Sequence, residues 1–319
     1  MFIGVDMGTT SFAAVLVNEK GEVLRTLTHP NGCTNEGLPP DVHEQDPDAM
    51  ADMAEELVAE LEAAAGGSVR RIGWTGQMHG VVGVDENLKA VTPFVTWRDA
   101  RRYGGHVMDG WARAGRKLFR CLPLPGYVIA RRTGRCVIDE TFLHSWHLEK
   151  AGEVPQEWLP DLVPGSMIGD NQAGVFAVQH ILPGYAVVNL GTSGQLSIVG
   201  EGHGGERRPF PGGRVLRCRA SLVGGRAFAE LKKELGLSWD EMNARAQSDP
   251  RIAACVRSIA DDLAGDLDLT GVTGLAGIGN ALVRNPCLKT AVAERFKMPC
   301  VVPPVAEIAA WGAALEVMT

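Results

Sequence analysis

The sequence predicts an α/β protein of two related lobes with a cleft between them. Two observations carry this prediction: a pattern of apolar strand, Gly-Thr turn and apolar strand occurs twice, and helical segments follow strands in each half. The two turns lie at residues 6–11 and 189–194. The length of 319 residues fits two domains, which we expect at residues 1–166 and 167–319.

The first half begins with apolar runs at 2–5 and 12–17, which predict two strands. Asp46 suits the N-cap of a helix and Pro47 suits its first turn. Apolar residues at helical spacing follow, and Gly66-Gly67 ends the helix. Further strands are expected at 22–28, 71–74, 81–84 and 91–95, with a mainly helical segment at 98–150.

The second half repeats the order of strands and then helices. Strands are expected at 185–190, 195–199 and 214–219, and a Gly-rich loop at 200–213 is expected between the last two. Ser238 and Glu241 have the spacing of a capping box. Other helices are expected near 226–235, at 251–264 and at 306–317.

Composition and charge exclude several classes of function. The net charge of −7 argues against a general nucleic-acid binder, which usually needs a basic face. No apolar run approaches the length of a membrane span, and the first residues lack the basic region of a signal peptide. We therefore expect a cytoplasmic protein with neither nucleic acid nor membrane as its partner.

The cysteine and histidine patterns do not predict a metal centre. The seven cysteines are odd in number and none has CxxC spacing, which favours reduced thiols. His144 and His147 are three residues apart, but zinc sites need three or four ligands. We expect these two histidines on one face of a partly buried helix.

The two Gly-Thr turns are candidate phosphate sites. Glycine lets backbone N–H groups approach a phosphate, and neighbouring hydroxyls add donors. The candidate phosphate holders are Gly8, Thr9, Thr10, Gly191 and Thr192. One such turn is more often only a turn, so the repetition carries the weight.

Two aspartates complete this chemistry. Asp6 adjoins the first turn and suits a hard cation such as Mg²⁺, held through water. Asp170 opens the second half in the sequence Gly-Asp-Asn-Gln and suits the acceptance of a proton from a sugar hydroxyl. Taken alone, Asp170 is more often a helix N-cap than a base.

Taken in order, these segments resemble the FGGY family of carbohydrate kinases, which has the two-lobed actin, Hsp70 and sugar-kinase (ribonuclease H-like) fold. The resemblance runs through nearly the whole chain. The matching motifs are Gly4–Ser11, Glu44–Pro47, Gly76–Gly80, Gly169–Ala173, Leu190–Gln195, Gly277–Asn285 and Glu307–Leu315.

The resemblance implies a functional role for residues in several of these motifs. Asp170 is the implied catalytic residue, Asp6 the implied metal anchor, and ATP with Mg²⁺ the implied cofactors. The implied sugar contacts are Gln77, Met78, His79, Trp97, Arg98 and Asn171. The implied nucleotide contacts are Gly8, Thr9, Thr10, Gly191, Thr192, Gly224, Gly225, Gly277, Gly279, Asn280 and Asn285. Residues 1–166 would then form the sugar-binding lobe, and residues 167–319 the nucleotide-binding lobe.

The implied activity is ATP-dependent phosphorylation of a ketose such as sedoheptulose, because Val95–Asp99 and Ala220–Gly225 resemble the sedoheptulokinases of the family. A xylulokinase, another ketose or polyol kinase, and a non-catalytic sugar or nucleotide sensor remain open. The Gly-Gln-Met-His-Gly motif argues against a chaperone or cytoskeletal ATPase. A homodimer is one assembly that we expect for this chain. The chain is shorter than the family's usual length, with the reductions at 99–169 and 225–274.

Overall fold

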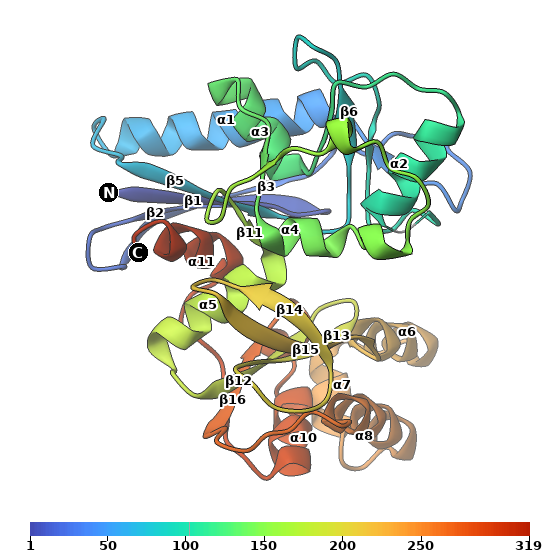
Figure 1. The fold of residues 1–319 in the computed structure, drawn as a ribbon. Helices are drawn as coiled ribbons and strands as arrows, with labels where there is room; N and C mark the ends of the chain where they lie inside the picture. The colour runs from blue at the N-terminus through green and yellow to red at the C-terminus, as the bar shows by residue number, and fades with distance from the viewer. Residues whose placement is uncertain (102) are drawn as a thin grey trace. The chain divides into compact units, whose positions relative to one another are not determined.

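The computed structural model describes residues 1–101 and 103–319, which form two compact units (Figure 1). Unit 1 comprises Met1–Ala177 and Glu307–Thr319, and unit 2 comprises Val178–Ala306. We expected a division at residue 166 with all later residues in the second lobe. The structure instead places the start of the helix at 170–181 and the C-terminal helix with unit 1.

Unit 1 is built on a mixed five-stranded sheet of order β11-β5-β1-β2-β3. β1 is antiparallel to β2 and parallel to β5, and β5 is parallel to β11. The strands are β1 (Phe2–Met7), β2 (Ser11–Val17), β3 (Val23–Pro30), β5 (Arg71–Gly76) and β11 (Ile168–Gly169). The first four agree closely with the expected strands.

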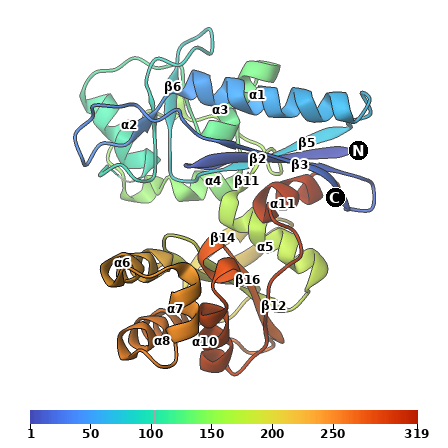
Figure 2. The same ribbon diagram turned by 180° about the vertical axis from the view of Figure 1, so that it is seen from behind.

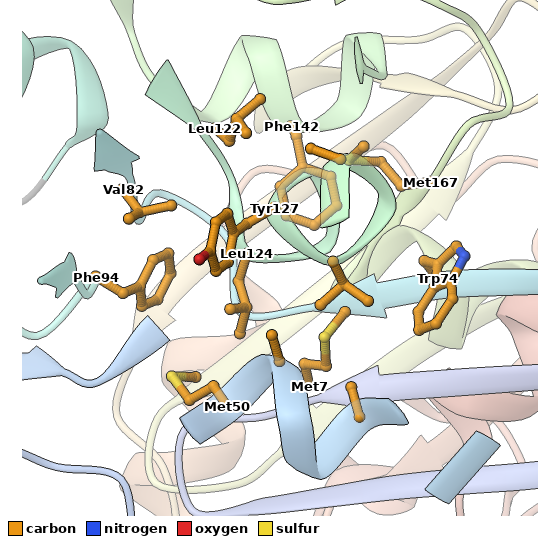
Figure 3. Close-up of a cluster of buried hydrophobic side chains, with 14 of the residues drawn as sticks. Met7, Met50, Trp74, Val82, Phe94, Leu122, Leu124, Tyr127, Phe142 and Met167 are labelled. Carbon is orange, nitrogen blue, oxygen red and sulfur yellow. The ribbon is translucent and has the colours of Figure 1, made fainter. Parts of the chain in front are cut away.

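Helices cover both faces of this sheet. Figures 1 and 2 show α1 (Pro47–Ala64) and α3 (Leu124–Thr133) on one face and α11 (Ile308–Glu316) on the other. The predicted start of α1 is confirmed, since the Asp46 side chain accepts from Asp48 N and Ala49 N. The core between α1, α3 and the sheet includes Met50, Trp74, Tyr127 and Phe142 (Figure 3).

Two glycines let α11 lie directly on the strands. A Cβ at Gly4 would be 1.8 Å from Ala310 O, and one at Gly73 would be 1.9 Å from Ala313 O. On the same helix, Gly312 approaches α5 (Asp170–Ile181), where a Cβ would be 1.9 Å from Ala173 O. This close packing explains why both the C-terminal helix and the start of α5 belong to unit 1.

The remaining elements of unit 1 are short. Among its described residues, the segment expected to be mainly helical contains three α-helices, one 3₁₀ helix and two brief strands, each of which pairs with a strand outside the segment. These elements are β4 (Glu44–Gln45), β6 (Val82–Val84), β7 (Phe94–Val95), α2 (Gly104–Arg113), β8 (Arg120–Leu122), β9 (Val137–Ile138), α4 (Glu140–Ser145), η1 (Leu148–Lys150), η2 (Gln156–Trp158) and β10 (Asp161–Leu162).

Unit 2 repeats part of the strand connectivity of unit 1 in a six-stranded sheet of order β14-β15-β13-β12-β16-β17. β12 is antiparallel to the next strand, β13, and parallel to the later strand β16, just as β1 is to β2 and β5. The strands are β12 (Tyr185–Leu190), β13 (Gly194–Val199), β14 (Glu206–Phe210), β15 (Arg214–Leu222), β16 (Gly274–Ile278) and β17 (Cys300–Val301). The predicted α/β class with two related halves is confirmed.

The helices of unit 2 are α6 (Gly225–Leu235), α7 (Trp239–Arg245), α8 (Pro250–Ala264), α9 (Asn280–Arg284) and α10 (Pro286–Phe296). The predicted capping box of Ser238 and Glu241 is present at the start of α7. The expected loop at 200–213 was wrong in part, since β14 pairs there with β15. In the part of the chain that the structure describes, no helix is long and apolar enough to cross a membrane.

Candidate active site

The candidate residues of unit 1 follow three parallel strands that end at one edge of its sheet. Gly76, at the end of β5, pairs with Met7 of β1 on one side and with Gly169 of β11 on the other. The three segments that follow these strands therefore start side by side. They carry the first Gly-Thr turn, the Gln-Met-His motif and Asp170. Ligands of open α/β sheets commonly bind at this edge.

Three carboxylates act on one another at this edge. The pKa of Asp6 is raised from its ordinary value of 3.8 to about 8, first by burial and then by the negative charges of Asp170 and Glu307. Thr28 Oγ1 donates a hydrogen bond to Glu307 Oε1 at 3.2 Å. Sequence reasoning gave Glu307 no chemical role, although its place just before the last helix of unit 1 was visible.

This electrostatic arrangement favours a cation near Asp6, because a positive charge relieves the repulsion and stabilises the ionised carboxylate. Within residues 1–101 and 103–319, no group of three His, Cys, Asp or Glu side chains forms a ready metal cage. Mg²⁺ is often held by one or two carboxylates with water and substrate phosphates. The donors near Asp6 fit that mode and not an all-protein cage.

Asp170 is exposed and is the first residue of α5. Its Oδ1 accepts from the backbone N–H of Asn171 at 2.6 Å, and the positive end of a helix stabilises a carboxylate at this position. The neighbouring Asn171 is buried, with 6% of its surface exposed. Asp170 thus presents its carboxyl group to solvent beside Asp6, as a group that receives a proton must.

The three carbonyl groups of the first Gly-Thr turn all accept hydrogen bonds from other residues of unit 1. Asn31 Nδ2 donates to Gly8 O at 2.9 Å, and Asn31 N donates to Thr10 O at 2.9 Å. Gln45 Nε2 donates to Thr9 O at 3.3 Å. In a trans peptide the N–H points opposite to the C=O. The N–H groups of Thr9 and Thr10 therefore point away from these donors, as a phosphate cradle requires.

The Gln77 side chain is buried in the protein and holds this turn. Its Oε1 accepts from Thr9 Oγ1 at 3.1 Å, and its Nε2 donates to Gln45 Oε1 at 2.8 Å. Gln77 is 3% exposed and Gln45 is 0% exposed. The residue predicted to contact a sugar therefore uses both ends of its amide on protein partners.

His79 has an unusual backbone conformation, and two contacts to Ser145 hold the residue in place. Its φ of 68° lies in the left-handed region, which is uncommon for a residue other than glycine. Its N–H donates to Ser145 Oγ at 3.1 Å, and its Nδ1 is 2.7 Å from Ser145 O. A carbonyl only accepts, so Nδ1 carries the proton, and in the neutral ring Nε2 is then an acceptor for a hydroxyl.

Two aromatic rings, which sequence reasoning missed, pack around His79. The centroid of Tyr103 is 5.4 Å from that of His79 and 4.3 Å from that of His147. The rings of His79 and His147 are parallel within 3° at 5.9 Å. His147 lies beyond the end of α4, with a φ of 50°, so the prediction that it shares a helical face with His144 was wrong.

The other predicted sugar contacts of unit 1 lie beside the first turn. Trp97 is 40% exposed, and its Nε1 donates to Thr9 Oγ1 at 2.9 Å. The guanidinium carbon of Arg98 is 5.4 Å from the centroid of the Trp97 ring. Met78 is buried against β11, because a Cβ at Gly169 would lie 2.7 Å from Met78 Sδ.

The second Gly-Thr turn lies in unit 2, where a helix end holds it. Gly225 N donates to Gly191 O at 2.9 Å, and Arg226 N donates to Thr192 O at 3.1 Å. By the same trans-peptide geometry, the N–H groups of Thr192 and Ser193 point away from α6. A Cβ at Gly191 would meet nothing within 4 Å, which leaves open space for a ligand.

The other predicted nucleotide residues of unit 2 pack around this turn. A Cβ at Gly224 would be 2.3 Å from Ser193 C, and one at Gly225 would be 2.5 Å from Gly191 O. Gly279 has a φ of 84°, and its Cβ would be 2.4 Å from Asn189 Oδ1. These glycines bring β12, α6 and the start of α9 close together.

Three further predicted nucleotide residues differ in exposure. Asn280 is exposed at the start of α9, and Gly277 is buried, where a Cβ would be 2.2 Å from Leu282 Cδ2. Asn285 is 3% exposed; its Nδ2 donates to Ala281 O at 2.7 Å and its Oδ1 accepts from Asn243 Nδ2 at 3.2 Å. The Asn285 amide therefore holds α7 and α9 together.

Comparison with known proteins identifies the first part of the chain. Residues 1–119 match the N-terminal domain of the FGGY family of carbohydrate kinases. The chain is 25% identical over 269 residues to the xylulose kinase of Klebsiella pneumoniae, in a match that covers 63% of this chain and 55% of that enzyme. The chain thus spans about half the length of the curated xylulose kinases that it matches.

A second relative and a solved structure extend this result. The chain is 30% identical over 138 residues to the gluconokinase of Bacillus subtilis strain 168, covering 41% of this chain and 23% of that protein. The crystal structure of a xyloylose kinase from Brucella ovis superimposes with a TM-score of 0.82 at 19% identity, covering 99% of this chain and 89% of that one. The likeness of structure confirms the sugar-kinase fold.

Proposed function

We propose that this chain, a member of the FGGY family of carbohydrate kinases, transfers the γ-phosphoryl group of ATP to a hydroxyl of a ketose or related polyol. The observation that carries the proposal is the meeting of Asp6, Asp170 and Glu307 beside the first Gly-Thr turn. Phosphoryl transfer needs held phosphates, a cation and a group that orients the acceptor hydroxyl. Unit 1 offers a candidate for each need.

Asp170 is the proposed catalytic residue. Its exposed carboxylate would accept a hydrogen bond from the sugar hydroxyl, orient the oxygen toward the phosphorus atom and take the proton. Because the transition state of phosphoryl transfer is loose, orientation contributes as much as basicity. The outward N–H groups of Thr9 and Thr10 would hold phosphate oxygens, with Gly191 and Thr192 as the proposed holders in unit 2.

Asp6 is the proposed anchor for Mg²⁺, through a bound water. When bound, Mg²⁺ neutralises charge on the phosphate oxygens. The raised pKa of Asp6 supports this role, because Asp6 would release its proton when the cation arrives. Gly224, Gly225, Gly277, Gly279 and Asn280 are the proposed nucleotide contacts.

The sugar is the finer part of the proposal. Xylulose is the first candidate, because curated relatives named xylulose kinase match 63% of this chain in sequence. Sedoheptulose stays a prediction that depends on the motifs at Val95–Asp99 and Ala220–Gly225. The apolar face of the sugar would rest on the exposed ring of Trp97, with the Nε2 atom of His79 accepting from a hydroxyl.

The test is an ADP-release screen over xylulose, sedoheptulose, gluconate and glycerol, run with the wild type and with Asp170→Asn. We expect sugar-dependent ADP release by the wild type and a roughly 10²–10⁴-fold lower turnover by the variant. Circular dichroism and binding of a non-hydrolysable ATP analogue serve as controls, and both should be unchanged. A flat response to every sugar, or near-normal turnover by Asp170→Asn, would refute the proposed function. Nucleotide binding without turnover would favour a sensor.

A further inference from the structure

We propose that Gln45 is a positioning residue. Its hydrogen-bond ring with Thr9 and Gln77 couples sugar binding at Trp97 to the conformation of the first Gly-Thr turn. The coupling rests on the proposed function, because it links the sugar side of unit 1 to the turn proposed to hold phosphate. No part of it requires Gln45 to touch either ligand.

The three residues form a closed ring of hydrogen bonds. Gln45 Nε2 donates to Thr9 O at 3.3 Å, Thr9 Oγ1 donates to Gln77 Oε1 at 3.1 Å, and Gln77 Nε2 donates to Gln45 Oε1 at 2.8 Å. Each residue is both donor and acceptor. A flip of either amide would place like groups against each other, so the direction of the ring is fixed.

Burial makes the ring costly to break. Gln45 is 0% exposed and Gln77 is 3% exposed, so water does not replace a lost partner. An unsatisfied buried amide is destabilising, whereas a paired one is not. The ring therefore tends to be made as a whole, and it holds the central carbonyl of the Gly8-Thr9-Thr10 turn.

Trp97 fixes the proton of the Thr9 hydroxyl. A hydroxyl has one proton, and because Trp97 Nε1 donates to Thr9 Oγ1, that proton is directed to Gln77 Oε1. Trp97 is 40% exposed, so its hydrogen bond lies at the solvent edge of the ring. A sugar that covers the indole restricts its motion and strengthens this bond.

The chain also connects the ring to the predicted sugar motif. Gln77 directly precedes Met78 and His79, and His79 is fixed by its two contacts to Ser145. A shift of the Gln-Met-His segment therefore moves Gln77 and with it Thr9. Both routes from the sugar side, through Trp97 and through Gln77, end at the same hydroxyl.

The thermodynamic consequence is that sugar and nucleotide binding are coupled. Sugar binding should raise the affinity for a non-hydrolysable ATP analogue, and by linkage the analogue should raise the affinity for sugar by the same factor. Coupling factors of this kind are typically about 5-fold or more. Loss of the ring should bring the factor close to one.

The decisive variants are Gln45→Met and Thr9→Val, each nearly isosteric and each missing ring hydrogen bonds. Thr9→Ser keeps the hydroxyl and serves as the rescue. Thr34→Val is the matched control, because Gln45 Nε2 also donates to Thr34 Oγ1 at 3.3 Å, outside the ring. Calorimetry with xylulose, or with the best sugar of the ADP-release screen, gives the dissociation constant of the ATP analogue with and without sugar.

We expect the wild type, Thr9→Ser and Thr34→Val to retain the coupling factor, and Gln45→Met and Thr9→Val to lose it. Retained coupling in Gln45→Met would overturn the proposal. If Gln45→Met fails to fold, the pair Thr9→Val and Thr9→Ser decides, because a coupling factor equal in both members overturns it.

A second measurement does not depend on the activity. The indole N–H signals of the seven tryptophans are observable by ¹⁵N NMR, and Trp97→Phe identifies the signal of Trp97. Gln45→Met and Thr9→Val should shift that signal in the ligand-free protein, whereas Thr34→Val should not. Unchanged signals would overturn the ring. A failed sugar screen with shifted signals would refute the proposed function alone.

Discussion

The two Gly-Thr turns of this chain have the same backbone pattern but are held by different means. In unit 1 the carbonyls of Gly8 and Thr9 accept from the side chains of Asn31 and Gln45. In unit 2 the carbonyls of the second turn accept from the backbone N–H groups at the start of α6. Side chains that hold a turn are able to move when neighbouring residues move, so the conformation of the first turn is adjustable. The conformation of the second turn is determined by the packing of a helix end.

The two turns also differ in electrostatic surroundings. Asp6, Asp170 and Glu307 lie beside the first turn, where burial and then the negative charges of Asp170 and Glu307 raise the pKa of Asp6 to about 8. Beside the second turn, Gly224, Gly225 and Gly279 approach its backbone closely. The proposed chemistry therefore belongs to unit 1, and unit 2 contributes shape and backbone donors.

The largest expected effect on stability tests whether close packing determines the conformation of the second turn. In Gly225→Ala the new Cβ would lie 2.5 Å from both Ala281 Cβ and Gly191 O. We expect a loss of about 1–3 kcal/mol in the free energy of unfolding, as for other overpacked sites, together with weaker binding of an ATP analogue. Chemical denaturation and calorimetry measure the two effects.

The matched control is Gly191→Ala, because a Cβ there meets nothing within 4 Å. Its free energy of unfolding should stay near that of the wild type, while its affinity for the ATP analogue falls if phosphate approaches Gly191. Equal destabilisation by the two alanines would show that packing does not set the second turn.

A second prediction uses pH to test the electrostatic difference between the turns. The pKa of Asp6 is raised from 3.8 to about 8 in the folded state, so the folded state binds more protons than the unfolded state between these values. The contribution of Asp6 to stability is therefore greatest below pH 4 and falls as the pH rises to 8. In buffer free of divalent cations, Asp6→Asn should raise the Tm at pH 8, with a smaller gain at pH 5.

Glu316 provides the control for this prediction. Burial raises its pKa from 4.5 to about 7, with a further increase from Asp139 that Arg71 opposes. Its contribution to stability therefore falls between pH 4.5 and 7 by the same linkage. Glu316→Gln should show a gain in Tm that is complete near pH 7 and should leave ADP release intact. A gain in Asp6→Asn that does not grow with pH would contradict the prediction.

The smallest expected effect concerns the capping box of unit 2, far in sequence from either turn. Ser238 Oγ accepts from Glu241 N at 3.2 Å, and Glu241 Oε2 accepts from Ser238 N at 2.8 Å. Ser238→Ala should lower the free energy of unfolding by about 1 kcal/mol. Binding of the ATP analogue should not change, and a change as large as that in Gly225→Ala would contradict a purely local role.

Local patterns in the sequence predicted the elements whose signals are local. The start of α1 follows from Asp46 and Pro47, and the start of α7 from Ser238 and Glu241, because caps are made within a few residues. The strands on either side of each Gly-Thr turn follow from apolar runs. β14 was missed, because its partner in the sheet and not its own pattern determines it.

The candidate site divides in the same way. Asp6, near the end of β1, and Asp170, directly after β11, were predicted as site residues because their segments have recognisable motifs. Glu307 and Gln45 were given no role, since nothing near them in the sequence indicates their partners. Gln77 was recognised as part of a motif, but its buried amide holds Thr9 and Gln45. Contacts between residues far apart in sequence have no local signal.

The sequence by itself determined the α/β class, the repeated strand-turn-strand unit and the residue types available for phosphate, cation and proton. Only the tertiary structure decided which donors hold each turn, because those donors are Asn31 and Gln45 in unit 1 and the start of α6 in unit 2. It also decided that α11 belongs to unit 1, where Gly4 and Gly73 leave room for its backbone. Spacing along the chain predicts a turn, whereas the orientation of its N–H groups depends on what holds its carbonyls.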